Sequence, residues 1–188
     1  VGQPLPGMSV QIVDPDSFAP LPPGTPGMLL VKGPNVMSGY LGREDLTANA
    51  LHDGWYITGD IAALDEDGFL TITDRLSRFS KIGGEMVPHG KVEEALQQAA
   101  GADTQVFAVT GIPDERKGEQ LAVVHTLDES QIPGIMTKLT ASGLPNLFIP
   151  PRTNFVKVDA LPLLGTGKMD LRGLKRIAME RLRGSAEL

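Results

Sequence analysis

The apolar and polar positions in the first part of the chain follow the pattern of short β-strands. Apolar or alternating runs occupy residues 9–13, 28–32 and 69–73, and Pro/Gly-rich turns such as 21–27 separate them. The turn sequence Asp-Glu-Asp-Gly at 65–68, between two apolar runs, predicts a β-hairpin. A short helix is expected at 44–50. We therefore expect residues 1–75 to form a small all-β, barrel-like unit.

After Arg75 the periodicity changes to a mixture of helices and strands. An apolar stripe at Val92, Ala95, Leu96 and Ala99 predicts a helix. The further expected elements are strands at 105–111 and 120–126 joined by a loop at 112–118, a helix at 130–141 with Pro133 in its first turn, a strand at 154–158, and an amphipathic helix at 170–183. Two helices leaning on a small sheet would make residues 76–188 an α+β domain.

Composition narrows the class of protein. The chain has 188 residues, of which 41% are hydrophobic, and this suits one domain or two small ones. No apolar run is long enough to span a membrane, and no signal-peptide pattern occurs. Zero cysteines exclude disulfides and thiolate metal sites and are compatible with the cytoplasm. A net charge of -6 argues against a general nucleic-acid coat.

Two smaller observations concern metals and the start of the chain. His52, His89 and His125 lie far apart in the sequence without metal-ligand spacing, so no zinc site is indicated. The chain opens on Val-Gly-Gln-Pro-Leu-Pro-Gly, which resembles a turn inside a structure. We therefore expect it to be one part of a longer protein.

Three short motifs carry the candidate chemistry. They are Trp-Tyr-Ile-Thr-Gly-Asp at 55–60, Thr-Asp-Arg followed by Lys-Ile-Gly-Gly-Glu within 73–85, and Gly-Thr-Gly-Lys-Met-Asp at 165–170. Each combines glycines suited to tight turns with a group that can hold a ribose, a phosphate or a carboxylate. None of the three is specific by itself.

The glycine–lysine motif at 165–170 does not fit a phosphate-binding P-loop. That loop needs a glycine at the position of Pro162 and Ser or Thr at the position of Met169. A lysine on a glycine loop can still bring a compact cation against developing negative charge. Lys168 is therefore either such a group or an ordinary surface lysine.

The other motifs have equally simple alternatives. Asp60, after Thr58 and Gly59, could accept hydrogen bonds from ribose hydroxyls, or could bond its own turn. Arg75 and Lys81 flank a segment that joins the two compositional regions, where they could also be solvated linker cations.

The order and spacing of the motifs resemble the adenylate-forming superfamily of acyl-CoA synthetases, nonribosomal peptide adenylation domains and luciferases. The stretches 27–33 and 36–40 also look like that superfamily's approach to the Thr-Gly-Asp motif, so the resemblance covers nearly the whole chain. Within it, residues 78–87 and 161–168 look most like acyl-acyl carrier protein synthetases, including the synthetase part of bifunctional 2-acylglycerophosphoethanolamine acyltransferase/acyl-ACP synthetases.

The resemblance implies a role for each motif residue. Asp60 would bind the ribose hydroxyls of ATP with help from Arg75, and Lys168 would hold the α-phosphate and the acyl carboxylate. A swing of the carboxyl-terminal domain about a hinge at Ser77 would then present Lys81, with Gly84 lining the pantetheine path, for thioester formation. The family usually has Asp or Lys at the pivot, whereas this chain has Ser77.

The resemblance also implies what lies outside the chain. Most of the site for ATP with Mg2+, and the acyl pocket, would lie upstream of residue 1. The chain would then be the β-rich end of a large adenylation domain followed by a mobile carboxyl-terminal domain. We expect it alone to be inactive in adenylation.

The last predicted helix suggests a partner. Its amphipathic pattern turns Leu171, Leu174, Ala178 and Leu182 inward. Its outward basic residues are Arg172, Arg176 and Arg183. This face could dock an acyl carrier protein, or an anionic lipid surface that places the parent protein at the inner face of the membrane, or could simply be solvated.

Three functions follow as alternatives. The first is an ATP-dependent acyl-ACP synthetase, which joins a fatty acid to the phosphopantetheine thiol of acyl carrier protein. The second is an acyl-CoA ligase or an amino-acid adenylation domain with the same chemistry. The third is a non-catalytic binding module of the same fold.

Overall fold

The chain divides into two compact units, Val1–Leu76 and the part from Ser77 onward. The structure is a computed structural model that describes residues 1–184, with side chains described up to Leu182. Arg183, expected on the basic helix face, therefore has its side chain outside the described set.

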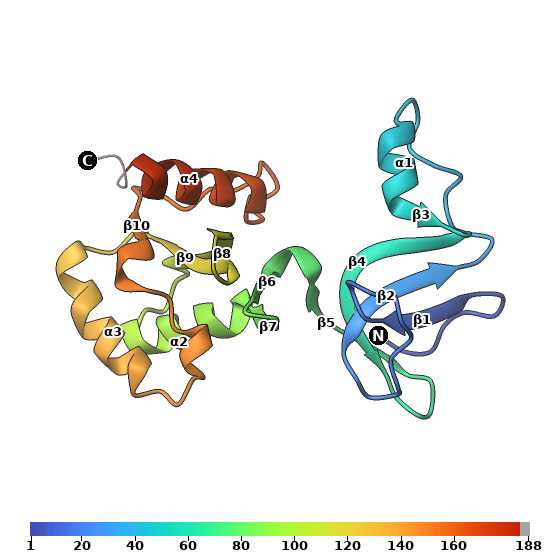
Figure 1. The fold of residues 1–188 in the computed structure, drawn as a ribbon, viewed down its shortest axis with the longest axis horizontal. Helices are drawn as coiled ribbons and strands as arrows, with labels where there is room; N and C mark the ends of the chain where they lie inside the picture. Colours follow the sequence, from blue (N-terminus) through green and yellow to red (C-terminus); the bar gives the residue numbers. More distant parts are fainter. Residues whose placement is uncertain (185–188) are drawn as a thin grey trace. The chain divides into compact units, whose positions relative to one another are not determined.

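The first unit is a curled antiparallel sheet with one short helix (Figure 1). Its strands pair in the order β1-β2-β4-β3, and β5 pairs with β4. The elements are β1 (Ser9–Val13), β2 (Gly27–Lys32), α1 (Glu44–Ala50), β3 (Leu51–His52), β4 (Trp55–Leu64) and β5 (Leu70–Arg75). Ile12, Leu29 and Ala62 form a buried cluster of the concave sheet. The turn Asp65–Gly68 joins β4 to β5, which confirms the predicted hairpin.

The second unit is a mixed sheet covered by helices on both faces (Figure 1). Its strands pair in the order β10-β9-β6-β7, and β8 pairs with β9. Its main elements are β6 (Phe79–Ile82), β7 (Glu85–Pro88), α2 (His89–Ala100), β8 (Phe107–Asp114), β9 (Gly118–His125), α3 (Ile132–Thr140), β10 (Phe155–Lys157) and α4 (Leu171–Gly184). Short 3-10 turns lie at Leu76–Arg78, Glu129–Gln131, Asn146–Phe148 and Arg152–Asn154.

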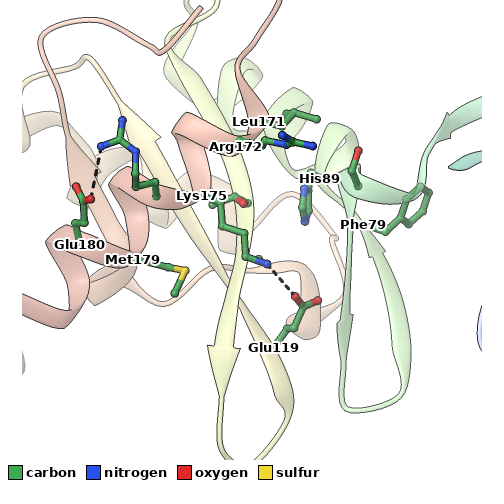
Figure 2. Close-up of a pocket in the computed structure, with 12 residues that line it drawn as sticks. Phe79, His89, Glu119, Leu171, Arg172, Lys175, Met179 and Glu180 are labelled. Carbon is green, nitrogen blue, oxygen red and sulfur yellow. Dashed lines mark ion pairs between the residues drawn. The ribbon is translucent and has the colours of Figure 1, made fainter. Parts of the chain in front are cut away.

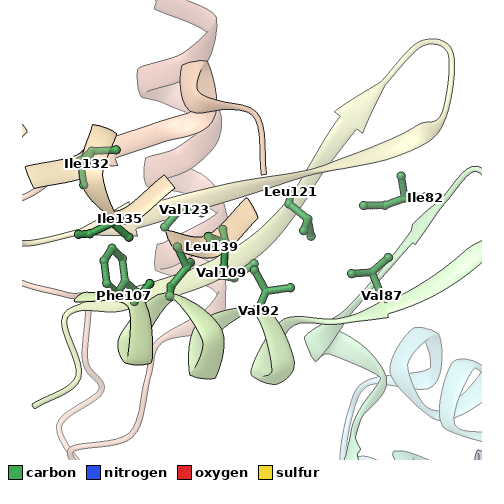
Figure 3. Packing of buried hydrophobic residues seen from close by; sticks show 12 residues of the cluster. Ile82, Val87, Val92, Phe107, Val109, Leu121, Val123, Ile132, Ile135 and Leu139 are labelled. Atoms are coloured by element: carbon green, nitrogen blue, oxygen red, sulfur yellow. The ribbon is translucent and has the colours of Figure 1, made fainter. Parts of the chain in front are cut away.

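Alternate residues of β8 and β9 supply two separate cores. Phe107 and Val109 pack with Leu121 and Val123 against α2 and α3, as Figure 3 shows. The intervening small residues Ala108 and Ala122 face α4. Because both faces of these strands are covered, their sequence is apolar almost throughout rather than alternating. This arrangement confirms the expected fold class of a β unit followed by an α+β unit.

Two strand segments differ from the sequence-based expectation. The segment 112–114, expected as a loop, continues β8, whose register reaches Asp114 opposite Gly118. Pro113 is tolerated there because β8 pairs only with β9 among the described strands, so its missing N–H costs no ladder bond. The segment after Arg75 also contains a hairpin, β6–β7, where only a connection was expected.

The helices of the second unit also differ in detail from the prediction. The helix expected at 130–141 begins with a 3-10 turn and becomes α-helical at Ile132, with Pro133 in its first turn. Three described α-helices, rather than two, pack on the sheet, because α4 covers the face opposite α2 and α3.

None of the helices within the described part of the chain is both long and apolar enough to cross a membrane.

Candidate functional site

In the first unit, Asp60 and Arg75 form a directed ion pair. They face each other as a register pair of β4 and β5, and Arg75 Nε donates to Asp60 Oδ1 at 2.7 Å. The Asp60 side chain is 21% exposed and that of Arg75 is 66% exposed, so the carboxylate is sheltered and the guanidinium is in solvent. No described residue donates a hydrogen bond to the other carboxylate oxygen, Oδ2.

The backbone around Asp60 fixes the direction of that carboxylate. Gly59 has a φ of 73°, a left-handed conformation that glycine adopts without strain. The Thr58 hydroxyl accepts from the Asp60 N–H at 3.0 Å and donates to the Leu29 carbonyl at 2.9 Å. The Thr-Gly-Asp motif is therefore a bend in β4 that is tied to β2, which gives each of its three residues a separate structural task.

Two tyrosines that sequence reasoning missed lie beside this pair. Burial raises the pKa of the Tyr56 phenol, and the neighbouring Tyr40 and Asp60 act in the same direction, whereas Arg75 opposes them. Tyr56 was visible within the first motif, but Tyr40 joins it only through the fold. The first unit thus presents an acidic, a basic and two phenolic groups together.

In the second unit, Lys81 and Gly84 lie on the β6–β7 hairpin. Lys81 is exposed on β6 and forms a register pair with Met86 of β7. Gly83 and Gly84 form the two-residue turn with φ values of 59° and 91°. Positive φ at both central positions is typical of a type I′ hairpin turn, which glycine favours. The motif therefore has a plain structural use in addition to any contact with a ligand.

Lys168 lies on a hydrogen-bonded loop just before α4. The Lys168 carbonyl accepts from the Leu164 N–H at 2.8 Å, and the Leu164 carbonyl accepts from the Gly167 N–H at 2.8 Å. The Lys168 side chain is exposed and makes no ion pair with a described residue. The loop thus presents one ammonium group to solvent on a defined backbone.

A cavity of about 640 Å³ lies under α4 in the same unit (Figure 2). Ser77, the expected hinge residue, lines it together with Phe79 and Arg172. His89 is also in its wall, 3% exposed, and its Nε2 lies 2.8 Å from Ser80 Oγ. Burial lowers the pKa of His89 to about 4, and the charges of Arg78 and Lys175 act in the same direction.

The basic face of α4 is present where the pattern predicted it. Leu174 and Ala178 are buried, whereas Arg172 and Arg176 are exposed. Arg176 approaches Glu180 at 3.6 Å, one helical turn away, and this exposed pair contributes little to stability. Arg172 has no ion-pair partner among the described residues.

The described part of the chain contains no cluster of metal-ligating side chains. No group of three or more His, Cys, Asp or Glu side chains within residues 1–182 is arranged to hold an ion. The described residues therefore do not supply a set of Mg2+ ligands of their own.

The predicted residues thus fall into separate groups. The structure brings Asp60 and Arg75 together in the first unit, and places Lys81 and Gly84 on one hairpin of the second. Lys168 stands on a different loop of that unit, and no hydrogen bond or ion pair joins it to this hairpin.

Comparisons with known proteins point to one family. The family described as "AMP-binding enzyme" matches residues 1–41. A feruloyl-CoA synthase from an Amycolatopsis species is 40% identical over 155 residues, which cover 81% of this chain and 31% of that protein. A long-chain-fatty-acid–CoA ligase from Escherichia coli O6:H1 is 34% identical over 188 residues, which cover 100% of this chain and 32% of that ligase.

The solved structures agree in fold. ATP-bound MatB from Rhodopseudomonas palustris superimposes with a TM-score of 0.73 at 31% identity, over 94% of this chain and 35% of that protein. The chain therefore spans about a third of the length of the relatives that it matches.

Proposed function

This chain belongs to the AMP-binding enzyme superfamily, and we propose that it is the carboxyl-terminal part of an ATP-dependent ligase that activates a fatty acid. In the first half-reaction a carboxylate oxygen attacks the α-phosphorus of ATP, and pyrophosphate leaves. In the second, the sulfur of a phosphopantetheine thiol attacks the acyl carbon of the adenylate, and AMP leaves.

The geometry of Asp60 carries this proposal. Arg75 engages Oδ1 of the carboxylate and leaves Oδ2 without a described donor, in a sheltered position at the bend of β4. A ribose offers two neighbouring hydroxyl donors, which a carboxylate can accept together or singly. We assign Asp60 and Arg75 to the nucleotide, as their place in the family motifs suggests.

The two lysines are assigned to successive half-reactions. Lys168, exposed on its loop, would place an ammonium group between the α-phosphate and the attacking carboxylate, where negative charge gathers. Lys81 and Gly84 would serve the thiol-transfer step, after a rotation of the second unit about Ser77. The ATP phosphates and Mg2+ would be held mainly by upstream parts of the full-length protein.

The lysine assignment is tested in the full-length enzyme. Lys168→Ala should slow acyl-adenylate formation on the order of 100-fold and affect thioester formation from supplied adenylate far less. Lys91→Ala, at an exposed lysine on α2, is the matched control and should leave both steps unchanged. Equal loss in both steps would remove Lys168 from its role.

Two acceptors could supply the thiol that receives the acyl group in the second half-reaction. The phosphopantetheine thiol is common to coenzyme A and to holo-acyl carrier protein. The relatives described above include CoA ligases, whereas residues 78–87 and 161–168 and the basic face of α4 favour the carrier protein. Supplying each acceptor in turn to the adenylate-loaded enzyme distinguishes them, and discharge by CoA alone would reject the carrier protein.

A further inference from the structure

The hairpin that carries Lys81 is attached to the rest of its sheet by few backbone bonds. β6 and β9 share the register pair Ile82–Gly118, and the Gly83 N–H donates to the Lys117 carbonyl at 2.9 Å. At Lys81, one residue before Ile82 in β6, the backbone N–H is bound by a side chain instead. It donates to Oε2 of Glu119 at 2.9 Å. The carboxylate thus extends a ladder that the two backbones do not continue.

The other oxygen of the same carboxylate reaches a helix. Glu119 Oε1 lies 3.7 Å from Nζ of Lys175, and Figure 2 shows this ion pair across the cavity under α4. Lys175 lies in the second turn of α4, seven residues after Lys168 in the chain. One carboxylate therefore contacts the strand that bears Lys81 and the helix that follows the Lys168 loop.

The space around Glu119 is closed to larger neighbours. A methyl group on Gly111 would lie 3.1 Å from Glu119 Oε1 and would overlap Ser80 Oγ. Ser80 is fully buried and paired with His89, so it has little freedom to move. The Glu119 side chain is 30% exposed, which keeps its hydrogen bond to the Lys81 N–H partly shielded from competing water.

Most of the cations that α4 contributes to the cavity are already paired with carboxylates. Two of its three cations from α4, Lys175 and Arg176, already have carboxylate partners in Glu119 and Glu180. Its walls therefore do not define an anion site, and the informative feature is the bridging role of Glu119.

We infer that Glu119 is a positioning residue for the thiol-transfer half-reaction, through its hydrogen bond to the Lys81 backbone. This inference rests on the proposed function of Lys81. The carboxylate holds β6 close to its turn, so that the Lys81 side chain and the Gly83–Gly84 turn keep one direction. The ion pair with Lys175 holds the carboxylate but is secondary, because Lys175 is half exposed.

The test uses three variants of the full-length enzyme. Glu119→Gln keeps an oxygen that can accept from Lys81, Glu119→Met keeps the length without that acceptor, and Lys175→Met removes only the ion pair. The Met variant at 119 should slow thioester formation about tenfold in kcat and change adenylation less than twofold. The Gln variant and Lys175→Met should stay within about threefold of wild type in both steps.

A second readout does not depend on activity. In the 188-residue chain, exchange of the Lys81 amide hydrogen should accelerate about tenfold in Glu119→Met and remain near wild type in Glu119→Gln. Glu119→Asp, which withdraws the carboxylate by one bond, gives the same test if the Met variant does not fold.

The outcomes separate the two proposals. Unchanged exchange at Lys81, or equal losses in both half-reactions, would overturn the role of Glu119. A wild-type full-length enzyme without adenylation activity would overturn the proposed function, while the exchange experiment would still decide whether Glu119 holds Lys81.

Discussion

Burial of His89 makes the stability of the folded chain depend on pH. The imidazole is 3% exposed beside Ser80, and its pKa falls from 6.5 to about 4. The charged groups facing it, Arg78 and Lys175, are both cationic and disfavour protonation further. The folded chain therefore holds the neutral form in a range where the unfolded chain binds a proton.

This gives a pH prediction with a definite sign. A depressed histidine pKa contributes stability that is complete above about pH 6.5 and decreases by about 3 kcal/mol as the pH falls to 4. Burial also lowers the pKa of His125, so part of the acid loss comes from there. Denaturant unfolding between pH 7 and 4 should show a smaller loss in His89→Asn than in wild type.

The control for this experiment is His52→Asn, at an exposed histidine of the first unit. It should reproduce the wild-type pH dependence. Identical curves for His89→Asn and wild type would contradict the assignment to His89.

Around Asp60, the sequence motifs indicate which residues matter but not which residues they contact. The motif identified Asp60 and Arg75 as candidates, but their contact depends on the register of β4 and β5. Tyr40 lies twenty residues before Asp60 in the chain, outside every strand, and only the fold brings it beside Tyr56. Local patterns describe a residue's own turn and not its neighbours in space.

Hydrophobic periodicity predicts most of the helices and strands, but it does not predict the hairpin β6–β7. Its signal was present, since Gly83-Gly84 separates two short runs with β-strand character. Ser80 and Lys81 made the first run look like a polar linker. Ser80 is nevertheless fully buried, because the imidazole of His89 satisfies its hydroxyl. A buried polar pair is invisible to a hydrophobic pattern.

The turn of this hairpin yields a stability prediction. Gly84 has a φ of 91°, where a side chain is strained. Gly84→Ala should therefore lower the free energy of unfolding by about 1–2 kcal/mol in denaturant titrations. Gly165→Ala is the matched control, because it has open space and no positive φ, and it should be neutral or slightly stabilising. Comparable losses in both variants would argue against the turn geometry.

The basic face of α4 gives a prediction about the acceptor. Reversing Arg172 and Arg176 to Glu in the full-length enzyme should raise the KM for acyl carrier protein about tenfold, with little change for CoA. Steady-state kinetics at low and high salt would measure this, since salt should reduce the difference. Arg116→Glu, on the β8–β9 loop, is the control. Unchanged KM values would leave this face as an ordinary solvated surface.

For the molecule as a whole, each unit has core residues of its own. The clusters that contain Val109 and Val124 draw their members from the second unit, and the cluster around Leu29 draws its members from the first. Composition allowed two small domains, and the change of periodicity after Arg75 suggested where they meet. The hinge motion about Ser77 stays a prediction, because periodicity carries no information about movement.

Separate cores predict separate folding. Residues 77–188 produced alone should unfold in one cooperative denaturant transition followed by circular dichroism, because both clusters on their sheet are retained. Residues 1–76, produced in parallel, provide the comparison. A gradual, non-cooperative transition of the 77–188 piece would show that it needs the first unit to fold.

The two-sided sheet of the second unit has a consequence for how its strands find their alignment. In a sheet with one wet face, a slip of one residue is penalised because apolar side chains move into water. Here a slip would move Phe107 into the place of Ala108, from one dry layer to another. Polarity therefore cannot specify the alignment of β8 and β9. Side-chain volume does so instead, since the layer under α4 accepts alanines where the opposite layer requires phenylalanine and valine.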